Sequence, residues 1–389
     1  MNIKTTLKTS VAAAALFAIA APVATPASAD IASGNKNKLV VSGQVVRALY
    51  YADDGFNEQL FNSTGATANT RVRWVASGTL NENVTAGATI EFDVQTSNTA
   101  DANFTDSGDG EVYEDKTSWS IRLQYAWVKH KQFGQLSLGR TDAAANGNDE
   151  FTLAGIGGVS TPNTLWQGGN IQFLETGTTA TGSFTGVAPG DVLTNLDFSS
   201  RDDVIRYDTP TFMGLSLAVS LNEGGRGEVG ARYSRKFGPI NMIVGAGYSK
   251  FSPVSTEFDD EIGGSIAVLH DSGLNASFAA GERSRKTGQV EGVGAHFWGA
   301  SGGYKAKIFK VGGTNFRIQY NQSTHVDARG DQGTGWGIDA MQNFDAIGAT
   351  VSLGYRNYDY ENKRAGHCAT GECSIDSVDV IGLQAAFQF

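Results

Sequence analysis

The chain has 389 residues, with 40 acidic and 30 basic side chains, a formal net charge of −10, 49 glycines, seven prolines and two cysteines. This acidic balance argues against a nucleic-acid partner, because proteins that bind nucleic acids present basic surfaces. The glycine excess comes without the proline that accompanies disordered or collagen-like chains. We therefore expect the glycines at turns and bulges of a strand-rich protein.

The N-terminal segment has the features of an export signal. Two lysines precede an apolar run over residues 11–21, and Ala-Ser-Ala at 27–29 forms a small-residue cleavage site. The apolar run is shorter than the roughly 20 residues of a membrane-spanning helix, so residues 1–29 are predicted to be a signal peptide. The signal contains two lysines and no acidic residue, which leaves 360 residues, 30–389, with a net charge of −12. These are expected to form one domain outside the cytoplasm.

Most of the chain after the signal alternates apolar and polar residues with a period of two, which is typical of half-buried strands. Residues 71–80 and 85–95 show this pattern on either side of a short turn at 81–83, and therefore predict a hairpin. The polar face carries the basic residues Arg71, Arg73, Arg122, Arg232, Arg317 and Arg356 and the acidic residues Glu91 and Asp93. Eight charged side chains on one face, most of them long arginines, predict a water-filled interior. We expect these eight side chains to line a pore.

The connections between the predicted strands alternate in length. Seven short turns separate eight longer loops, the first of them spanning 53–69, and together they predict about sixteen antiparallel strands. An even number of strands, with short periplasmic turns and long extracellular loops, is typical of an all-β transmembrane barrel in a bacterial outer membrane. A soluble sandwich would instead place the apolar face in a closed core.

Two features predict which face contacts lipid. Trp119 and Trp127 share the apolar parity of one strand, and eight tilted residues rise roughly 19 Å, close to the height of a lipid-facing band between aromatic girdles. At the C-terminus Leu383 and Phe387 alternate with glutamine and alanine. The apolar face of this last strand is therefore expected to contact lipid.

The longest connection, residues 141–202, follows the fifth predicted strand. A barrel of this size leaves an aqueous channel, and so long an insertion is usually functional. The loop contains the acidic residues Asp142, Asp149 and Glu150, followed later by Asp191 and Asp197. Folded into the lumen, these carboxylates would face the wall arginines and create a transverse field at the constriction. In the alternative, the loop projects outward and the arginines pair with Glu91 and Asp93.

Four segments and the last residue resemble the general porins of Gram-negative bacteria, most closely the alphaproteobacterial type. The segments are "LVVSGQVVRALYYADDG", "YAWVKHKQFGQLSLGR", "SRDDVIRYDTPTFMG" and "LGYRNYDY". The resemblance covers residues 39–389 and implies a homotrimer of sixteen-stranded barrels in outer-membrane lipid, each with a pore narrowed by an inward third loop. It also implies that Phe389 is an assembly signal read by the barrel-assembly machinery. Residues 168–196 fit no pattern of the family.

The remaining candidate sites are local. Cys368 and Cys373 are expected to form a disulfide, as is common in exported proteins, with a metal pair assisted by His367 as the alternative. The acidic loop 101–115 lacks the regular ligand spacing of calcium loops and is expected to be solvated. No metal site, cofactor or catalytic constellation is predicted.

These features predict passive diffusion of small hydrophilic solutes and ions through an outer-membrane channel. The net charge of −12 on the exported chain and the acidic loop favour a weak preference for cations. The alternative function is a surface receptor or adhesin that uses the long extracellular loops.

Overall fold

The structure is a computed structural model that describes residues 29–32, 37–65, 69–95, 103–104, 118–156, 168–175, 185–286, 293–327, 329–362 and 375–389. The predicted disulfide and nearly all of the signal peptide and the acidic loop 101–115 lie outside these residues. Among the described residues, no helix is long and apolar enough to cross a membrane.

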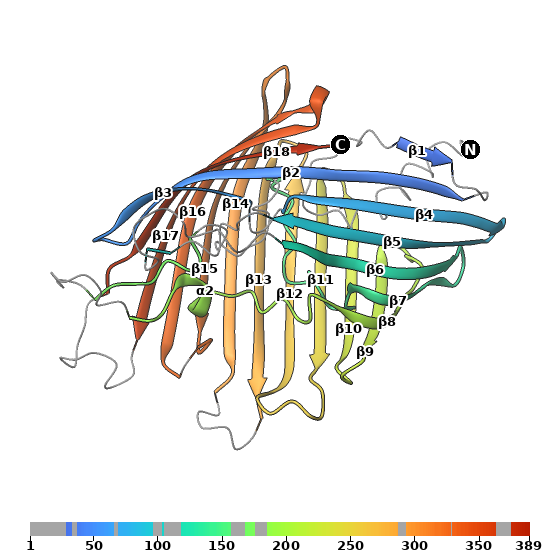
Figure 1. Ribbon diagram of the computed structural model, residues 1–389, viewed down its shortest axis with the longest axis horizontal. Helices are drawn as coiled ribbons and strands as arrows, with labels where there is room; N and C mark the ends of the chain where they lie inside the picture. The colour runs from blue at the N-terminus through green and yellow to red at the C-terminus, as the bar shows by residue number, and fades with distance from the viewer. Residues whose placement is uncertain are drawn as a thin grey trace.

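Nearly all the regular structure is antiparallel strand (Figure 1). The strands are β1 (Ala29–Ala32), β2 (Lys38–Asp53), β3 (Glu58–Ser63), β4 (Arg71–Asn81), β5 (Val84–Gln95), β6 (Ser118–His130), β7 (Gly134–Asp142), β8 (Arg201–Asp208), β9 (Leu215–Asn222), β10 (Gly227–Phe237), β11 (Ile240–Lys250), β12 (Phe258–His270), β13 (Leu274–Arg285), β14 (Ala295–Phe309), β15 (Gly312–Thr324), β16 (Asp331–Phe344), β17 (Ala349–Asn362) and β18 (Val378–Gln388). Within the described residues, two short helical segments, α2 (Pro189–Val192) and η2 (Asp345–Ile347), lie between strands.

The strands close into a barrel, because β18 pairs with β2 and every other neighbouring pair is joined in turn. β3 pairs with the second half of β2 and β4 with the first half, so these two strands together cross the wall once. Counting them as one and leaving β1 outside the wall gives the sixteen-stranded antiparallel barrel that the sequence predicts. Seven short connections lie at one end and the longer loops at the other.

The first loop is shorter than the sequence predicts. Residues 53–69 were expected to be one connection, but β3 lies within them. The chain turns back at once because the Asp54 carboxylate accepts hydrogen bonds from the backbone N–H groups of Asn57, at 2.6 Å, and Phe56, at 3.0 Å. Aspartate makes such local turns readily.

The C-terminal strand has the faces expected from its alternation. Leu383 and Phe387 are exposed on the outside of the barrel, whereas Gln384 is buried on the inside. The last residue closes the ring, since the N–H of Phe389 donates to the Gly43 carbonyl at 3.0 Å and the Gly43 N–H donates back at 2.8 Å.

A β-bulge in β6 changes the expected faces of that strand. Glu91 of β5 pairs with Leu123 while its neighbour Phe92 pairs with Ile121, so Arg122 is an extra residue in the ladder. Trp119, before the bulge, is 67% exposed on the outside. Trp127, after it, pairs with the buried, inward-facing Ser137 of β7. The prediction that the two tryptophans mark the height of one lipid-facing band is therefore wrong, because they lie on opposite faces.

Candidate functional site

The connection between β7 and β8, residues 143–200, is called the long loop below. Its first limb lies against the inner face of the wall. The backbone N–H of Ala144 donates to Ser220 Oγ of β9 at 2.8 Å, and that of Phe151 donates to Ser265 Oγ of β12 at 2.9 Å. Arg206 of β8 donates to the Asp142 carbonyl at 2.8 Å.

The last part of the long loop is held in the same way by β15. The backbone of Thr194 exchanges two hydrogen bonds with Ser323 of β15, at 3.1 and 3.0 Å. Figure 1 shows this part of the chain, in green with α2, crossing the strands coloured yellow to orange. The described parts of the long loop therefore lie inside the barrel, as predicted.

The segment that matched no family pattern, residues 168–196, includes the apolar part of the loop. Phe173, Val192 and Leu193 are buried against aromatic side chains of β2, β3 and β17, and the ring of Phe173 stacks on Tyr360 with 5.5 Å between centroids. Burial of aromatic rings is among the larger contributions to packing. This cluster fixes the loop to the wall on the side where the barrel closes.

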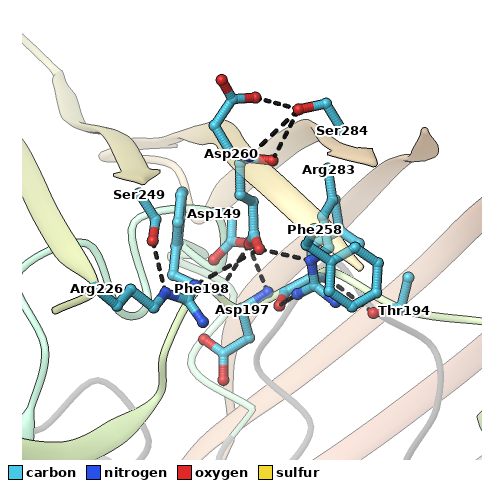
Figure 2. A network of polar contacts seen from close by, with 12 residues as sticks. Asp149, Thr194, Asp197, Phe198, Arg226, Ser249, Phe258, Asp260, Arg283 and Ser284 are labelled. Atoms are coloured by element: carbon cyan, nitrogen blue, oxygen red, sulfur yellow. Dashed lines mark hydrogen bonds and ion pairs between the residues drawn. The ribbon is translucent and has the colours of Figure 1, made fainter. Parts of the chain in front are cut away.

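The end of the long loop bends sharply around a buried carboxylate. Leu196, Asp197 and Phe198 have φ angles of 67°, 45° and 48°, a left-handed conformation that costs a non-glycine residue about 1–2 kcal/mol. Glu261 of β12 accepts a hydrogen bond from the Phe198 N–H at 2.8 Å and pairs with Arg283 of β13 at 2.7 Å. Arg226 and Arg283 enter this network from opposite sides (Figure 2). The wall therefore holds the loop in a bend that its sequence alone would not favour.

The acidic residues of the loop are mostly enclosed. Asp149 is 1% exposed, and its carboxylate accepts the Asp197 N–H at 3.3 Å. Burial, followed by the neighbouring Glu150, raises the pKa of both Asp149 and Asp197 well above the ordinary 3.8. Burial also raises the pKa of Glu150, whose carboxylate accepts a hydrogen bond from Asn195 at 2.5 Å that opposes the shift. Asp142 keeps about a third of its side chain exposed, 3.9 Å from Arg201.

A basic cluster lies on β4 and β6, around Glu91 and Asp93 of β5. The Glu91 carboxylate contacts Arg122 at 2.9 Å and Arg71 at 3.8 Å, and also pairs with Arg73. Arg122 reaches Asp93 at 3.3 Å. The Arg73 side chain is 37% exposed whereas that of Glu91 is 2% exposed. The two carboxylates therefore lie behind the guanidinium groups, which are the more exposed part of the cluster, and the pore-lining role of Glu91 and Asp93 stays a prediction.

The other three predicted arginines have different surroundings. Arg317 of β15 and Arg356 of β17 share the Asp339 carboxylate at 3.0 and 2.7 Å, and both side chains are 0% exposed. They do not line open water, because the inner face of these strands is enclosed. Arg232 of β10 donates to Asn148 of the loop at 2.6 Å. The inward parity of all three is as predicted, but Arg232 contacts the loop whereas Arg317 and Arg356 pair with a carboxylate of the wall.

The residues that anchor the loop were not predicted as a group. Arg206, Ser220, Ser265 and Ser323 all lie on the inward face of their strands. The two-residue period could have placed them on that face. It could not have shown which part of the loop each one meets, since the anchored segments lie up to 129 residues away.

Comparisons with known proteins agree with this architecture. The anion-selective porin from Comamonas acidovorans is similar over 91% of this chain and 100% of its own, with a TM-score of 0.59 and 13% identity. The outer membrane channel DcaP of Acinetobacter baumannii covers 93% of this chain and 100% of its own, with a TM-score of 0.56 and 14% identity. For OmpT of Vibrio cholerae in its trimer form the values are 91%, 100%, 0.50 and 14%. At these identities the likeness shows the fold alone.

No curated protein matches the chain significantly. The sequence profile of the Gram-negative porins, however, matches residues 11–368. That match covers nearly all of the barrel, including the long loop. The chain therefore belongs to the Gram-negative porin family, and its barrel is an outer-membrane channel.

Proposed function

We propose that the channel is water-filled and lets small hydrophilic solutes and ions diffuse passively, without catalysis, across the outer membrane. The wall side chains of a sixteen-stranded barrel do not fill its lumen. The described residues of the long loop contact the inner wall from β9 to β18 and also β2 and β3, and we place the passage beside β4 to β6. The observation that carries the proposal is the exposure of 37% of the Arg73 side chain inside a closed barrel.

The same geometry supports a weak preference for anions in place of the cation preference expected from net charge. In the basic cluster three guanidinium groups face two carboxylates. The loop carboxylates of Asp149 and Asp197 are enclosed, and their raised pKa values favour the neutral form. Local potential at the constriction, rather than total charge, sets the selectivity of a pore.

A homotrimer is the proposed assembly. Arg47 of β2 lies outward between the exposed Val45 and Leu49, with its guanidinium group 2.7 Å from Asn62 of β3. An arginine that faces lipid at mid-depth costs a barrel about 2–4 kcal/mol, a cost that contact with another copy would remove. The trimer form of the Vibrio OmpT supports this assembly.

Export and insertion complete the proposal. Residues 1–29 would direct secretion and be removed, and Phe389 would be read by the barrel-assembly machinery. The exposed ring of Phe389 at the edge of the barrel is accessible for such recognition. The disulfide between Cys368 and Cys373 stays a prediction.

The test is single-channel recording of the purified protein in a planar bilayer under a KCl gradient. We expect ohmic current steps that occur in groups of three. The reversal potential should be shifted from zero toward the equilibrium potential of chloride. A reversal potential shifted toward the equilibrium potential of potassium would overturn the anion preference but not the proposed channel function. Folded protein that carries no current would overturn the channel and favour a receptor or adhesin.

A further inference from the structure

The bulge at Arg122 brings two aromatic side chains into the lumen. Beyond it, Tyr125 pairs with the buried Thr89, and Trp127 pairs with Ser137 on the other side. Ala126 and Val128 then take the outward face and are exposed. Bulges commonly re-aim side chains beside functional sites. Tyr125 and Trp127 are half-buried, so each ring keeps part of its surface open to the lumen.

The indole of Trp127 lies along the wall. Its neighbour on β5 is Gly87, and a Cβ atom at that position would come within 2.5 Å of the Trp127 ring atom Cζ2. The missing side chain therefore lets the indole rest on the strand backbone. A ring that rests on the wall in this way offers its other face to a passing solute.

The two rings continue directly from the basic cluster. Glu91, which holds Arg73 and Arg122, pairs with Leu123. Tyr125 is two residues further toward the short-turn end of the barrel, about 7 Å at the rise of a strand. A solute with a ring and a carboxylate separated by one bond spans a similar distance. It could place its ring on Tyr125 and its carboxylate against the guanidinium groups.

We propose that Tyr125, Trp127 and the basic cluster form a binding site for aromatic carboxylates inside the channel. The aromatic faces stack with a flat ring, and arginine binds a carboxylate through paired, charge-assisted hydrogen bonds. The excess of one guanidinium over the carboxylates of the cluster favours an anionic solute over a neutral sugar. The inference rests on the proposed channel function and names the class of solute that the channel retains.

Ion current through the wild-type protein tests the solute class without any substitution. Benzoate, cyclohexanecarboxylate, benzyl alcohol and acetate are each added to one side of the bilayer in KCl. Benzoate is expected to reduce the current at a concentration at least tenfold below the other three. Equal effects of benzoate and cyclohexanecarboxylate would overturn the role of the flat rings, and equal effects of benzoate and benzyl alcohol would overturn that of the arginines.

Variants locate the site. Trp127→Leu combined with Tyr125→Leu is expected to raise the half-blocking concentration of benzoate about tenfold, the combined effect of two stacking contacts. The matched control is Trp119→Leu, on the outward face of the same strand, which should leave that concentration unchanged. Unchanged blocking in the double variant would overturn the site. Should the double variant not fold, Trp127→Phe with Tyr125→Phe retains both rings, and normal benzoate block is then expected. Absence of any KCl current in the wild type would refute the channel itself.

Discussion

Two parts of the wall carry the same inward arginines in different surroundings. On β4 and β6 the guanidinium groups of Arg71, Arg73 and Arg122 are partly exposed and lie in front of Glu91. On β15 and β17 those of Arg317 and Arg356 are fully enclosed with Asp339 between them. The position of a residue along a strand sets the face on which its charge lies. Whether that charge interacts with solutes or only contributes to stability depends on whether other residues enclose it.

The largest expected effect is on stability. Asp339→Asn would leave two enclosed guanidinium groups without their shared carboxylate, and breaking a buried ion pair in this way costs about 3–5 kcal/mol. Urea unfolding of the refolded barrel in detergent measures the loss. Glu91→Gln is the matched comparison, because its arginines reach water, and is expected to cost about 1 kcal/mol. Equal losses would remove the distinction between the two parts of the wall.

The second prediction concerns ion selectivity. Glu91→Gln removes a negative charge from the exposed cluster and should increase the chloride-to-potassium permeability ratio by about twofold to fivefold, whereas Arg73→Gln should lower it by a similar factor. Reversal potentials under a KCl gradient measure both changes. Arg317→Gln is the control, since it leaves Asp339 and Arg356 paired one to one and should not shift the reversal potential. A shift in that variant would mean that the enclosed cluster also acts on the ions.

The strands, their turns and the barrel that they form could be predicted from the sequence, whereas the individual contacts between distant residues could not. Turns such as 81–83 and the alternation of the C-terminal strand depend on neighbouring residues, so they could be predicted. The bulge at Arg122 could not, because residues 123–128 include apolar side chains on both parities. The enclosure of Asp149 depends on a loop that is held by residues from many strands, such as Ser323, 129 residues from Thr194. A period of two carries no information on such contacts.

The smallest expected effect is a pH dependence of the loop anchor. Burial raises the pKa of Asp149 and Asp197 in the folded loop above the value of 3.8 that they have when released. The folded loop therefore binds more protons than the released loop in the interval between these values, so its anchoring is strongest below pH 3.8 and weakens as the pH rises through the raised pKa. Each group contributes at most about 1.4 kcal/mol per pH unit.

Current noise and limited proteolysis of the loop should therefore both increase as the pH is raised from below 3.8. Asp149→Asn with Asp197→Asn keeps both groups neutral at every pH and should flatten this dependence, while Asp142→Asn, at the partly exposed end of β7, should not. A pH dependence that survives in the double variant would assign the effect to other carboxylates around the bend, of which Glu261 is the one that accepts the Phe198 N–H. The position of the loop would then depend on wall residues such as Glu261, which hold its end, and these residues would influence the ion current.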